Sequence, residues 1–197
     1  MKEIIEKVSG LYLKYGIKSV TMEDVARELG ISKKTLYQYF KDKDDLVKKV
    51  VDFHMDMQHK SMKDFASAKM NAIEELLMVS KFISDFLKRI NPSVTYDIQK
   101  YYPEIWKNIT SNRRDHIYNQ IKDNMKRGIK EGLYRKDLNI EIIAHFYLLR
   151  LDTASTLDLL TEDKYSYEEI FTAFFRYHIR GIANQKGIDY LESKIEK

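Results

Sequence analysis

The sequence predicts an all-α protein, and three observations support this fold class. The chain of 197 residues contains only two prolines and seven glycines, so few positions would interrupt a helix. Apolar residues recur at steps of three and four along most of the chain, which is the spacing of one helix face. Residue types that cap helix N-termini precede several of these segments. The length is enough for one large domain or two small ones with a buried core.

The composition excludes several classes of protein. An apolar fraction of 44% is too high for a disordered chain. The absence of cysteine excludes disulfide scaffolds, thiolate zinc sites, iron–sulfur clusters and a cysteine nucleophile. No run of eighteen apolar residues occurs, and the first residues mix acids with apolar side chains, unlike a signal peptide. We therefore expect a soluble, cytoplasmic protein that does not enter a membrane.

The first expected helix covers residues 2–15, where Ile5, Val8 and Tyr12 fall on one face. Gly16 follows it, as is common where a helix ends. The next segment begins with Thr21-x-x-Asp24, a capping box that opens a helix of about two turns.

A second short helix is expected directly afterwards, over residues 33–39. Gly30 supplies a tight turn before it, and Ser32 is its N-cap. Leu36 and Phe40, four residues apart, should point back to the core. Two short helices joined by a turn containing glycine form a helix-turn-helix.

The rest of the chain predicts longer helices. Pro103 fits a first helical turn, and Gly132 fits the end of the same helix. The last two helices are apolar on more than one side, so each must pack against more than one neighbour. The expected segments are 43 to 60 or beyond, 71–90, 93–101 (a short helix or a turn), 103–131, 139–160 and 166–185.

The outward face of the second short helix carries side chains that suit DNA. Lysine can bind phosphates or base edges, glutamine can pair with adenine, and a threonine methyl can meet the methyl of thymine. Tyrosine hydroxyls can bind phosphate oxygens. Lys43 lies in the first turn of the following helix, where free amides and the helix dipole favour an anion. The alternative to DNA binding, for each residue taken alone, is that it is an ordinary exposed lysine or a tyrosine that only packs against its neighbours.

The segment from Thr21 to Leu46, TMEDVARELGISKKTLYQYFKDKDDL, closely resembles the DNA-binding region of TetR-family transcriptional regulators. The resemblance implies a helix-turn-helix DNA-binding domain over residues 1–46 and a ligand-binding and dimerisation domain over residues 47–197. In many relatives the residue at Lys34 is glycine or proline, so this position departs from the family pattern. The residues at the family's DNA-contact positions are Thr21, Ser32, Lys33, Lys34, Thr35, Tyr37, Gln38, Tyr39 and Lys43.

The same resemblance implies a ligand cavity enclosed by the helices near 43–60, 72–90 and 103–131. Residues 51–197 contain 19 of the 24 aromatic residues and six of the eight methionines. Such a lining would suit a hydrophobic, aromatic or cationic inducer. The alternative is that these side chains only fill the core. The candidate ligand residues are Phe53, Met57, Met78, Phe82, Phe86, Tyr96, Trp106 and Tyr118.

The last two helices match the family's homodimer interface, a four-helix bundle made by two copies of the pair. Deep burial inside one chain is the competing explanation for their apolar faces. The candidate interface residues are Phe146, Leu149, Thr153, Leu157, Phe171, Phe174, Phe175, His178 and Ile182.

No pattern in the sequence predicts an enzyme, a cofactor or a metal site. The five histidines include no pair at i, i+4, and no HExxH, Walker A, GxGxxG or GxSxG sequence occurs. The sequence therefore predicts a ligand-responsive repressor that binds a palindromic DNA operator as a homodimer and leaves it when an inducer binds. Two alternatives remain open: the same fold acting as an activator or ligand-independent DNA-bound factor, and an all-helical enzyme or interaction module with an incidental helix-turn-helix.

Overall fold

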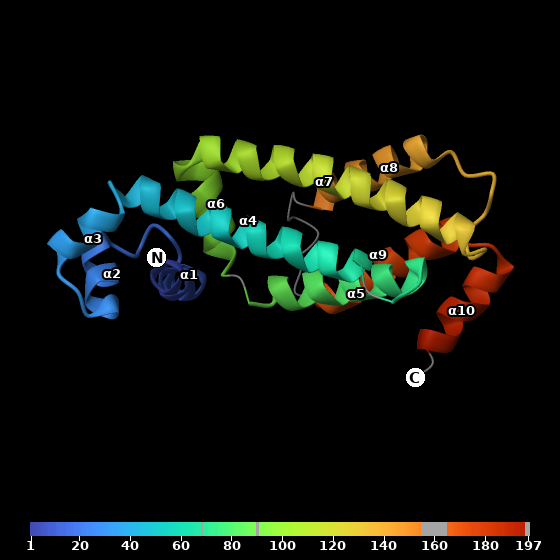
Figure 1. Cartoon of the computed structure of the whole chain (residues 1–197), viewed down its shortest axis with the longest axis horizontal. Helices are drawn as coiled ribbons and strands as arrows, with labels where there is room; N and C mark the ends of the chain where they lie inside the picture. The colour runs from blue at the N-terminus through green and yellow to red at the C-terminus, as the bar shows by residue number, and fades with distance from the viewer. Residues whose placement is uncertain (68, 90, 155–164, 196–197) are drawn as a thin grey trace. The chain divides into compact units, whose positions relative to one another are not determined.

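The computed structural model describes residues 1–67, 69–89, 91–154 and 165–195, and confirms the all-α fold class (Figure 1). Within this part of the chain no helix combines the length and apolar character needed to cross a membrane. The helices are α1 (Lys2–Tyr15), α2 (Met22–Leu29), α3 (Lys33–Tyr39), α4 (Lys43–Ser67), α5 (Ala72–Leu87), α6 (Pro92–Tyr101), α7 (Pro103–Lys130), α8 (Ile140–Ala154), α9 (Tyr167–Ile182) and α10 (Gln185–Ile195).

The chain forms two compact units, each built from two stretches of sequence. Unit 1 comprises Met1–Ser61 and Arg89–Ser111, and unit 2 comprises Met62–Lys88 and Asn112–Lys197. Unit 1 therefore contains the predicted helix-turn-helix together with α6.

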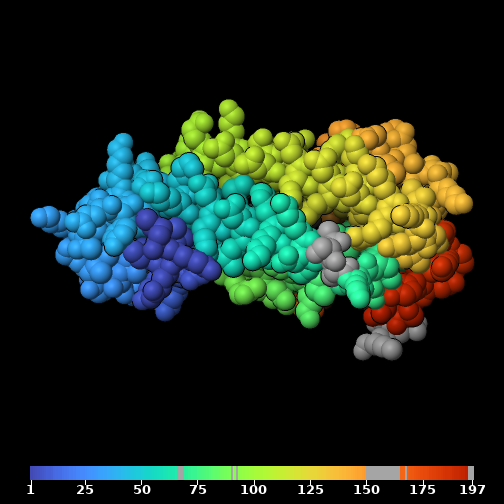
Figure 2. Space-filling view, viewed as in Figure 1, coloured from blue at the N-terminus to red at the C-terminus, as the bar shows by residue number. Residues whose placement is uncertain are grey.

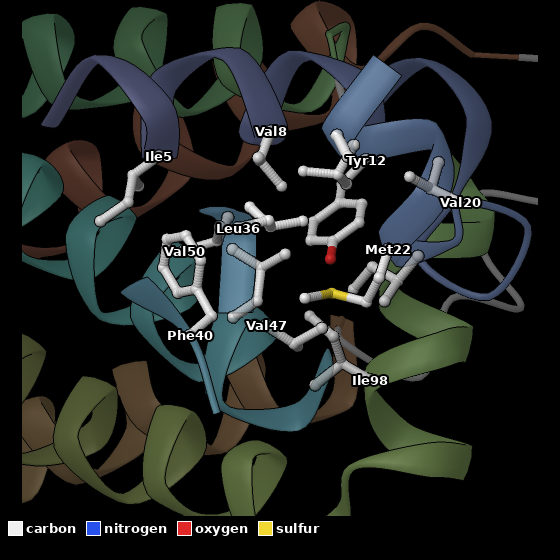
Figure 3. Packing of buried hydrophobic residues seen from close by; sticks show 14 residues of the cluster. Ile5, Val8, Tyr12, Val20, Met22, Leu36, Phe40, Val47, Val50 and Ile98 are labelled. Carbon is white, nitrogen blue, oxygen red and sulfur yellow. The ribbon is translucent and has the colours of Figure 1, made fainter. Parts of the chain in front are cut away.

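The core of unit 1 holds α1, α2, α3, the start of α4 and α6 together. Leu36 and Phe40 are 0% and 1% exposed, which confirms that this pair points back to the core. Val8 and Tyr12 of α1 and Ile98 of α6 belong to the same buried cluster (Figure 3). The short helices α2 and α3 are thus supported by longer ones, as helices of seven or eight residues require in water.

Unit 2 has a separate core, built around α5, α8, α9 and the C-terminal half of α7. Its buried members include Ile73, Met125, Tyr134, Phe175 and Leu191. Leu191 is contributed by α10, a helix that follows the last segment expected from the sequence, 166–185, and was not predicted.

The predicted helix 166–185 is observed as α9 and ends at Ile182, three residues earlier than predicted, where the break before α10 begins. Ala183 forms an isolated bridge with Tyr134, and the N–H of Asn184 donates to the carbonyl of Leu133 at 3.0 Å. The Asn184 side chain then accepts a 3.0 Å hydrogen bond from the N–H of Gly187 in the first turn of α10. The predicted helix 139–160 is observed up to Ala154, and its remaining positions lie outside the described residues.

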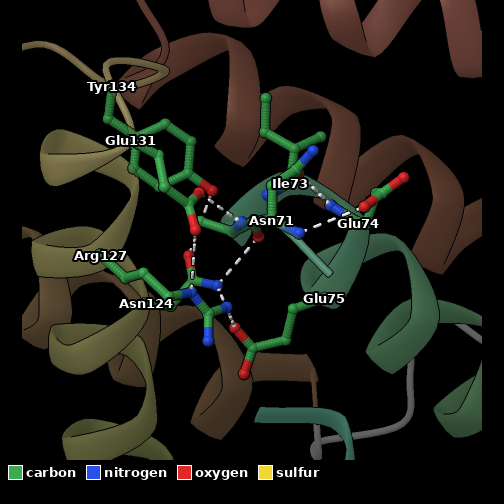
Figure 4. A network of polar contacts seen from close by, with 9 residues as sticks. Asn71, Ile73, Glu74, Glu75, Asn124, Arg127, Glu131 and Tyr134 are labelled. Atoms are coloured by element: carbon green, nitrogen blue, oxygen red, sulfur yellow. Dashed lines mark hydrogen bonds and ion pairs between the residues drawn. The ribbon is translucent and has the colours of Figure 1, made fainter. Parts of the chain in front are cut away.

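A buried polar network joins α5 to α7 inside unit 2 (Figure 4). The Glu75 carboxylate pairs with Arg127 and accepts a 2.6 Å hydrogen bond from the amide of Asn124. Asn124 in turn accepts a 3.1 Å hydrogen bond from the Tyr134 hydroxyl. Glu131 accepts a 2.8 Å hydrogen bond from the N–H of Ala72 at the start of α5. The bonds from Arg127 and Asn124 compensate the cost of burying the carboxylate of Glu75, a residue that is only 7% exposed.

Candidate nucleic-acid interface

The start of α2 is set by the predicted capping box. The Thr21 hydroxyl accepts a 3.2 Å hydrogen bond from the N–H of Asp24, and the Asp24 carboxylate accepts one of 2.9 Å from the N–H of Thr21. The Thr21 hydroxyl also donates to this carboxylate at 2.6 Å. These bonds from Thr21 lower the pKa of Asp24, so the carboxylate that caps α2 stays charged.

The turn between α2 and α3 depends on Gly30, whose φ of 66° lies in the left-handed region. The N–H of Ile31 closes this turn on the carbonyl of Ala26 at 3.0 Å. Ser32 then caps α3 by accepting a 3.0 Å hydrogen bond from the N–H of Thr35. The two hydroxyls of Ser32 and Thr35 also share a hydrogen bond of 2.8 Å. The helix-turn-helix geometry thus follows from local sequence signals.

The outward face of α3 is exposed while its inward face is buried. Lys33, Lys34 and Gln38 are exposed, and Tyr37 and Tyr39 are 45% and 42% exposed. In Figure 2 the blue segment that contains α2 and α3 lies at the surface of its unit. The structure therefore brings these five predicted residues together on one short helix, with donors that suit phosphates and base edges.

Lys43 lies in the first turn of α4, but its ammonium group is engaged within unit 1. Its Nζ atom donates to the carbonyl of Lys18 at 3.2 Å. Burial lowers the pKa of Lys43, and nearby Asp97, Asp44 and Asp24 partly oppose this effect. Lys43 shares a shallow hollow with Lys18, Asp44, Tyr101 and Tyr102.

Sequence reasoning missed Lys49 of α4, which contacts the end of α3, and Asp97 of α6, which contacts the turn before α2. The Nζ atom of Lys49 donates to the carbonyl of Tyr39 at 3.2 Å and to Asp45 at 2.8 Å. The i, i+4 spacing of Asp45 and Lys49 is a sequence signal for their ion pair. The contact of Asp97 spans 79 residues to Lys18, so no local pattern could have revealed it.

The eight predicted ligand residues are divided equally between the two units. In unit 1, Phe53 and Trp106 pack against the core, whereas Met57 and Tyr96 are 52% and 54% exposed. The other four are Met78, Phe82, Phe86 and Tyr118 in unit 2.

Two of the unit 2 members have defined partners. Phe82 meets Phe65 edge to face at 5.6 Å, and the Tyr118 hydroxyl donates to Glu141. A shared ligand cavity for all eight stays a prediction.

The predicted dimer residues on α8 are exposed. Phe146 and Leu149 are 60% and 57% exposed, and Ile142, four residues before Phe146, is 51% exposed. The side chain of Thr153 and the whole of Leu157 lie outside the described residues.

The prediction for α9 needs a correction, because Phe175 and Ile182 are 1% and 2% exposed inside the core of unit 2 and so present no surface to a second copy. Phe171 and Phe174 pack partly against the same core. The His178 ring lies 4.9 Å from that of Tyr147. Tyr177 on the same helix is 64% exposed, and its position was not predicted to lie at an interface.

Comparisons with known proteins agree with this arrangement. Residues 4–50 match the family described as bacterial regulatory proteins, tetR family. The HTH-type transcriptional regulator YvaF of Bacillus subtilis is 30% identical over 89 residues, which cover 45% of this chain and 47% of that protein. The HTH-type transcriptional repressor KstR2 of Mycobacterium tuberculosis is 22% identical over 151 residues, covering 73% of this chain and 74% of the relative.

Solved structures share the fold over nearly the whole chain. A transcriptional regulator from Cytophaga hutchinsonii superposes with a TM-score of 0.79 at 18% identity, covering 93% of this chain and 98% of that one. A regulator from Saccharomonospora viridis, solved in complex with choline, has a TM-score of 0.73 at 19% identity, covering 93% of this chain and 97% of that one. Residues 4–50 thus belong to the tetR family of bacterial regulatory proteins, and the matches over the rest of the chain support a TetR-family transcriptional regulator.

Proposed function

We propose that this protein is a ligand-responsive repressor that binds a palindromic operator as a homodimer and leaves it when a small-molecule inducer binds. The observation that carries the DNA-binding part is the face of α3, where Lys33, Lys34, Tyr37 and Gln38 are exposed opposite the fully buried Leu36. TetR-family regulators are generally non-enzymatic DNA-binding proteins.

The chemistry of this face suits a major groove. A recognition helix of the helix-turn-helix class lies in the groove with its side chains at base edges. Gln38 can bond adenine in two places, while Lys33 and Lys34 can bond guanine or phosphate. The Tyr37 hydroxyl can bond a phosphate oxygen, which fixes the register of α3 on the duplex.

A homodimer would present two copies of α3 to one face of the DNA. Helix-turn-helix dimers bind half-sites whose centres are about 34–36 Å apart, one turn of the double helix. The exposed apolar side chains of Ile142, Phe146 and Leu149 on α8 support the dimer, because a surface stripe of this kind is typical of an interface.

The inducer part of the proposal rests on the family and on the aromatic residues outside the helix-turn-helix. The similar regulator from Saccharomonospora viridis was solved in complex with choline, a small cation. A ligand that favours one conformation by about 1–3 kcal/mol would change DNA affinity 5–150-fold. A hydrophobic, aromatic or cationic compound fits the residue types predicted to bind it.

DNA binding can be tested by selecting duplexes from a randomised double-stranded library with the wild-type protein. Affinity for a selected duplex is then measured at several salt concentrations for wild type and for Lys33→Ala/Lys34→Ala. The control is Lys2→Ala/Lys7→Ala, which removes the same charge from α1, where these lysines pair with Glu6 and Glu3.

If the α3 lysines neutralise phosphates, the slope of log affinity against log salt falls by about 0.9 for each lost contact. The Lys2/Lys7 variant should keep the wild-type slope. Equal behaviour of the two double variants would contradict a role for α3, and failure of the wild type to enrich any duplex would contradict operator binding altogether.

The inducer part has its own test, in which thermal unfolding is followed with choline or benzyltrimethylammonium. A ligand at about 100 times its dissociation constant stabilises the folded state by about 2.7 kcal/mol. A compound that raises the melting temperature should also weaken binding to the selected duplex. If compounds of this class stabilise the protein without changing DNA binding, the ligand-independent form of the function is favoured.

A further inference from the structure

One side chain of α4 holds the C-terminal end of α3. The Nζ atom of Lys49 donates to the backbone carbonyl of Tyr39, the last residue of α3, at 3.2 Å. The same ammonium group pairs with Asp45 at 2.8 Å and lies 5.2 Å from the centre of the Phe40 ring. Lys49 thus makes three contacts at the point where α3 ends.

The α3 helix needs such support because it has only seven residues. The last carbonyls of any α-helix lack intrahelical partners, and a cation near that end is favoured by the helix dipole. Ser32 caps the start of α3, and the extended Phe40 ends it, with its N–H on the carbonyl of Leu36. Lys49 supplies a donor that this C-terminal end would otherwise lack from within its own helix.

Asp45 extends the same arrangement to the turn that follows α3. Its Oδ2 atom accepts a 3.0 Å hydrogen bond from the N–H of Lys41 as well as the bond from Lys49. The hydrogen bonds from Lys49 and Lys41 lower the pKa of Asp45, so this carboxylate is charged at neutral pH. Asp45 and Lys49, one turn apart on α4, therefore bind the backbone of Lys41 and Tyr39, on the two sides of the point where α3 ends.

We propose that Lys49 is a positioning residue for DNA recognition, acting through its bond to the Tyr39 carbonyl rather than through contact with DNA. By fixing the end of α3, it sets the direction in which Tyr37, Gln38 and Tyr39 project from the helix. This inference rests on the proposed binding of DNA by α3, and it assigns a function to a residue outside the helix-turn-helix.

Lys49→Met tests the inference, because methionine keeps much of the length of the side chain and removes the donor. Lys49→Arg keeps a cationic donor and should retain the wild-type affinity for the selected duplex. Lys48→Met is the matched control, since Lys48 is the adjacent lysine on α4 and pairs with Asp52 at 2.5 Å, away from α3. Affinities are measured for a duplex selected by the wild type and for a scrambled duplex of the same composition, across a series of salt concentrations.

The expected result is a loss of affinity of about five- to tenfold for the selected duplex in Lys49→Met, the size expected for one lost hydrogen bond, with unchanged binding to the scrambled duplex. The salt slope should match that of the wild type, and Lys49→Arg and Lys48→Met should bind the selected duplex normally. If Lys49→Met weakens both duplexes equally and lowers the slope by about 0.9, Lys49 touches a phosphate and the inference is overturned. If Lys49→Met binds like Lys48→Met, the inference is also overturned.

Asp45→Asn provides a second test with the opposite electrostatic sign. This variant loses one negative charge, so the change in net charge alone would tighten binding to every duplex. Loss of the carboxylate that orients Lys49 should instead weaken binding to the selected duplex several-fold. Tighter binding to both duplexes would overturn the inference, whereas a wild-type protein that selects no duplex would overturn the proposed function and this inference with it.

Discussion

The Oδ2 atom of Asp97 in α6 accepts a hydrogen bond of 2.7 Å from the backbone N–H of Lys18, in the turn between α1 and α2. The Asp97 side chain is buried, and the Nζ atom of Lys18 donates to the Tyr101 hydroxyl at 2.6 Å. Near the other end of α6, the amide of Asn91 donates to the carbonyl of Lys14 at 3.1 Å. The segment that leads into the helix-turn-helix is therefore held along the length of α6.

Replacement of Asp97 by alanine should loosen this segment. Asp97→Ala leaves the N–H of Lys18 without its protein acceptor, and we expect a loss of about 1–2 kcal/mol in the free energy of unfolding. Asp97→Asn retains an acceptor oxygen and should lose less. Urea unfolding measures both, with the exposed Asp115→Ala on α7 as a control expected within about 0.5 kcal/mol of wild type. Equal stability of Asp97→Ala and Asp115→Ala would show that the bond contributes nothing.

Gly16 should not tolerate a side chain, for two separate reasons. Its φ of 81° is strained for any other residue, and an added Cβ would lie 2.5 Å from the Oγ atom of Ser93 in α6. We expect Gly16→Ala to lower the free energy of unfolding by about 2 kcal/mol or more. Gly10→Ala in α1 is the matched control, because no atom lies within 4 Å of its added Cβ.

Alanine also favours a helix by roughly 0.5–1 kcal/mol over glycine, so Gly10→Ala should raise the melting temperature. Circular dichroism melts of the two variants therefore have opposite expected signs. A stabilised Gly16→Ala variant would contradict the close approach of α6.

Acid should weaken the contact between α5 and α10. Hydrogen bonds from Lys194, Tyr190 and the N–H of Asn71 lower the pKa of Glu74 from 4.5 to about 2. A lowered pKa in the folded state means that the contribution of Glu74 is present above pH 4.5 and is lost as the pH falls toward 2. We expect Glu74→Gln to cost roughly 1 kcal/mol at pH 7 after solvent screening, and progressively less as the pH falls from 4.5 toward 2.

Urea unfolding at pH 7, 4.5 and 3 measures this difference, and Glu28→Gln on α2 is an exposed control expected to match the wild type. A cost of Glu74→Gln that is the same at every pH would mean that the lost contacts do not depend on the charge of the carboxylate.

Dimerisation should depend on the exposed face of α8. Phe146 is 60% exposed, and a carboxylate there would be desolvated without a partner in an apolar interface. We expect wild-type protein to have twice the chain mass of 23.5 kDa in light scattering after size exclusion, and Phe146→Asp to shift toward the monomer. Tyr15→Asp on α1, where the tyrosine is 52% exposed, should stay dimeric. A dimeric Phe146→Asp variant would place the interface elsewhere, and a monomeric wild-type protein would contradict the dimer itself.

The sequence by itself determined the elements whose signals are local. The Thr21–Asp24 capping box, the left-handed Gly30 and the Ser32 cap each involve residues a few positions apart, so the helix-turn-helix and its outward side chains were predictable. The start of α5 at Asn71 with Glu74 is a further example, because its capping box also lies within four residues.

Tertiary structure decided where a helix stops and which apolar face meets which neighbour. The break before α10 depends on the amide of Asn184 reaching the carbonyl of Gly132 at 3.0 Å, a contact across 52 residues. Periodicity placed Phe175 on an apolar helix face, but it could not distinguish burial in the core of its own unit from burial against a second copy of the chain. The structure shows Phe175 buried and Tyr177 exposed. The contact of Lys49 with α3 and that of Asp97 with the turn before α2 likewise required the fold, because the energy of such contacts depends on distance in space and not on separation along the chain.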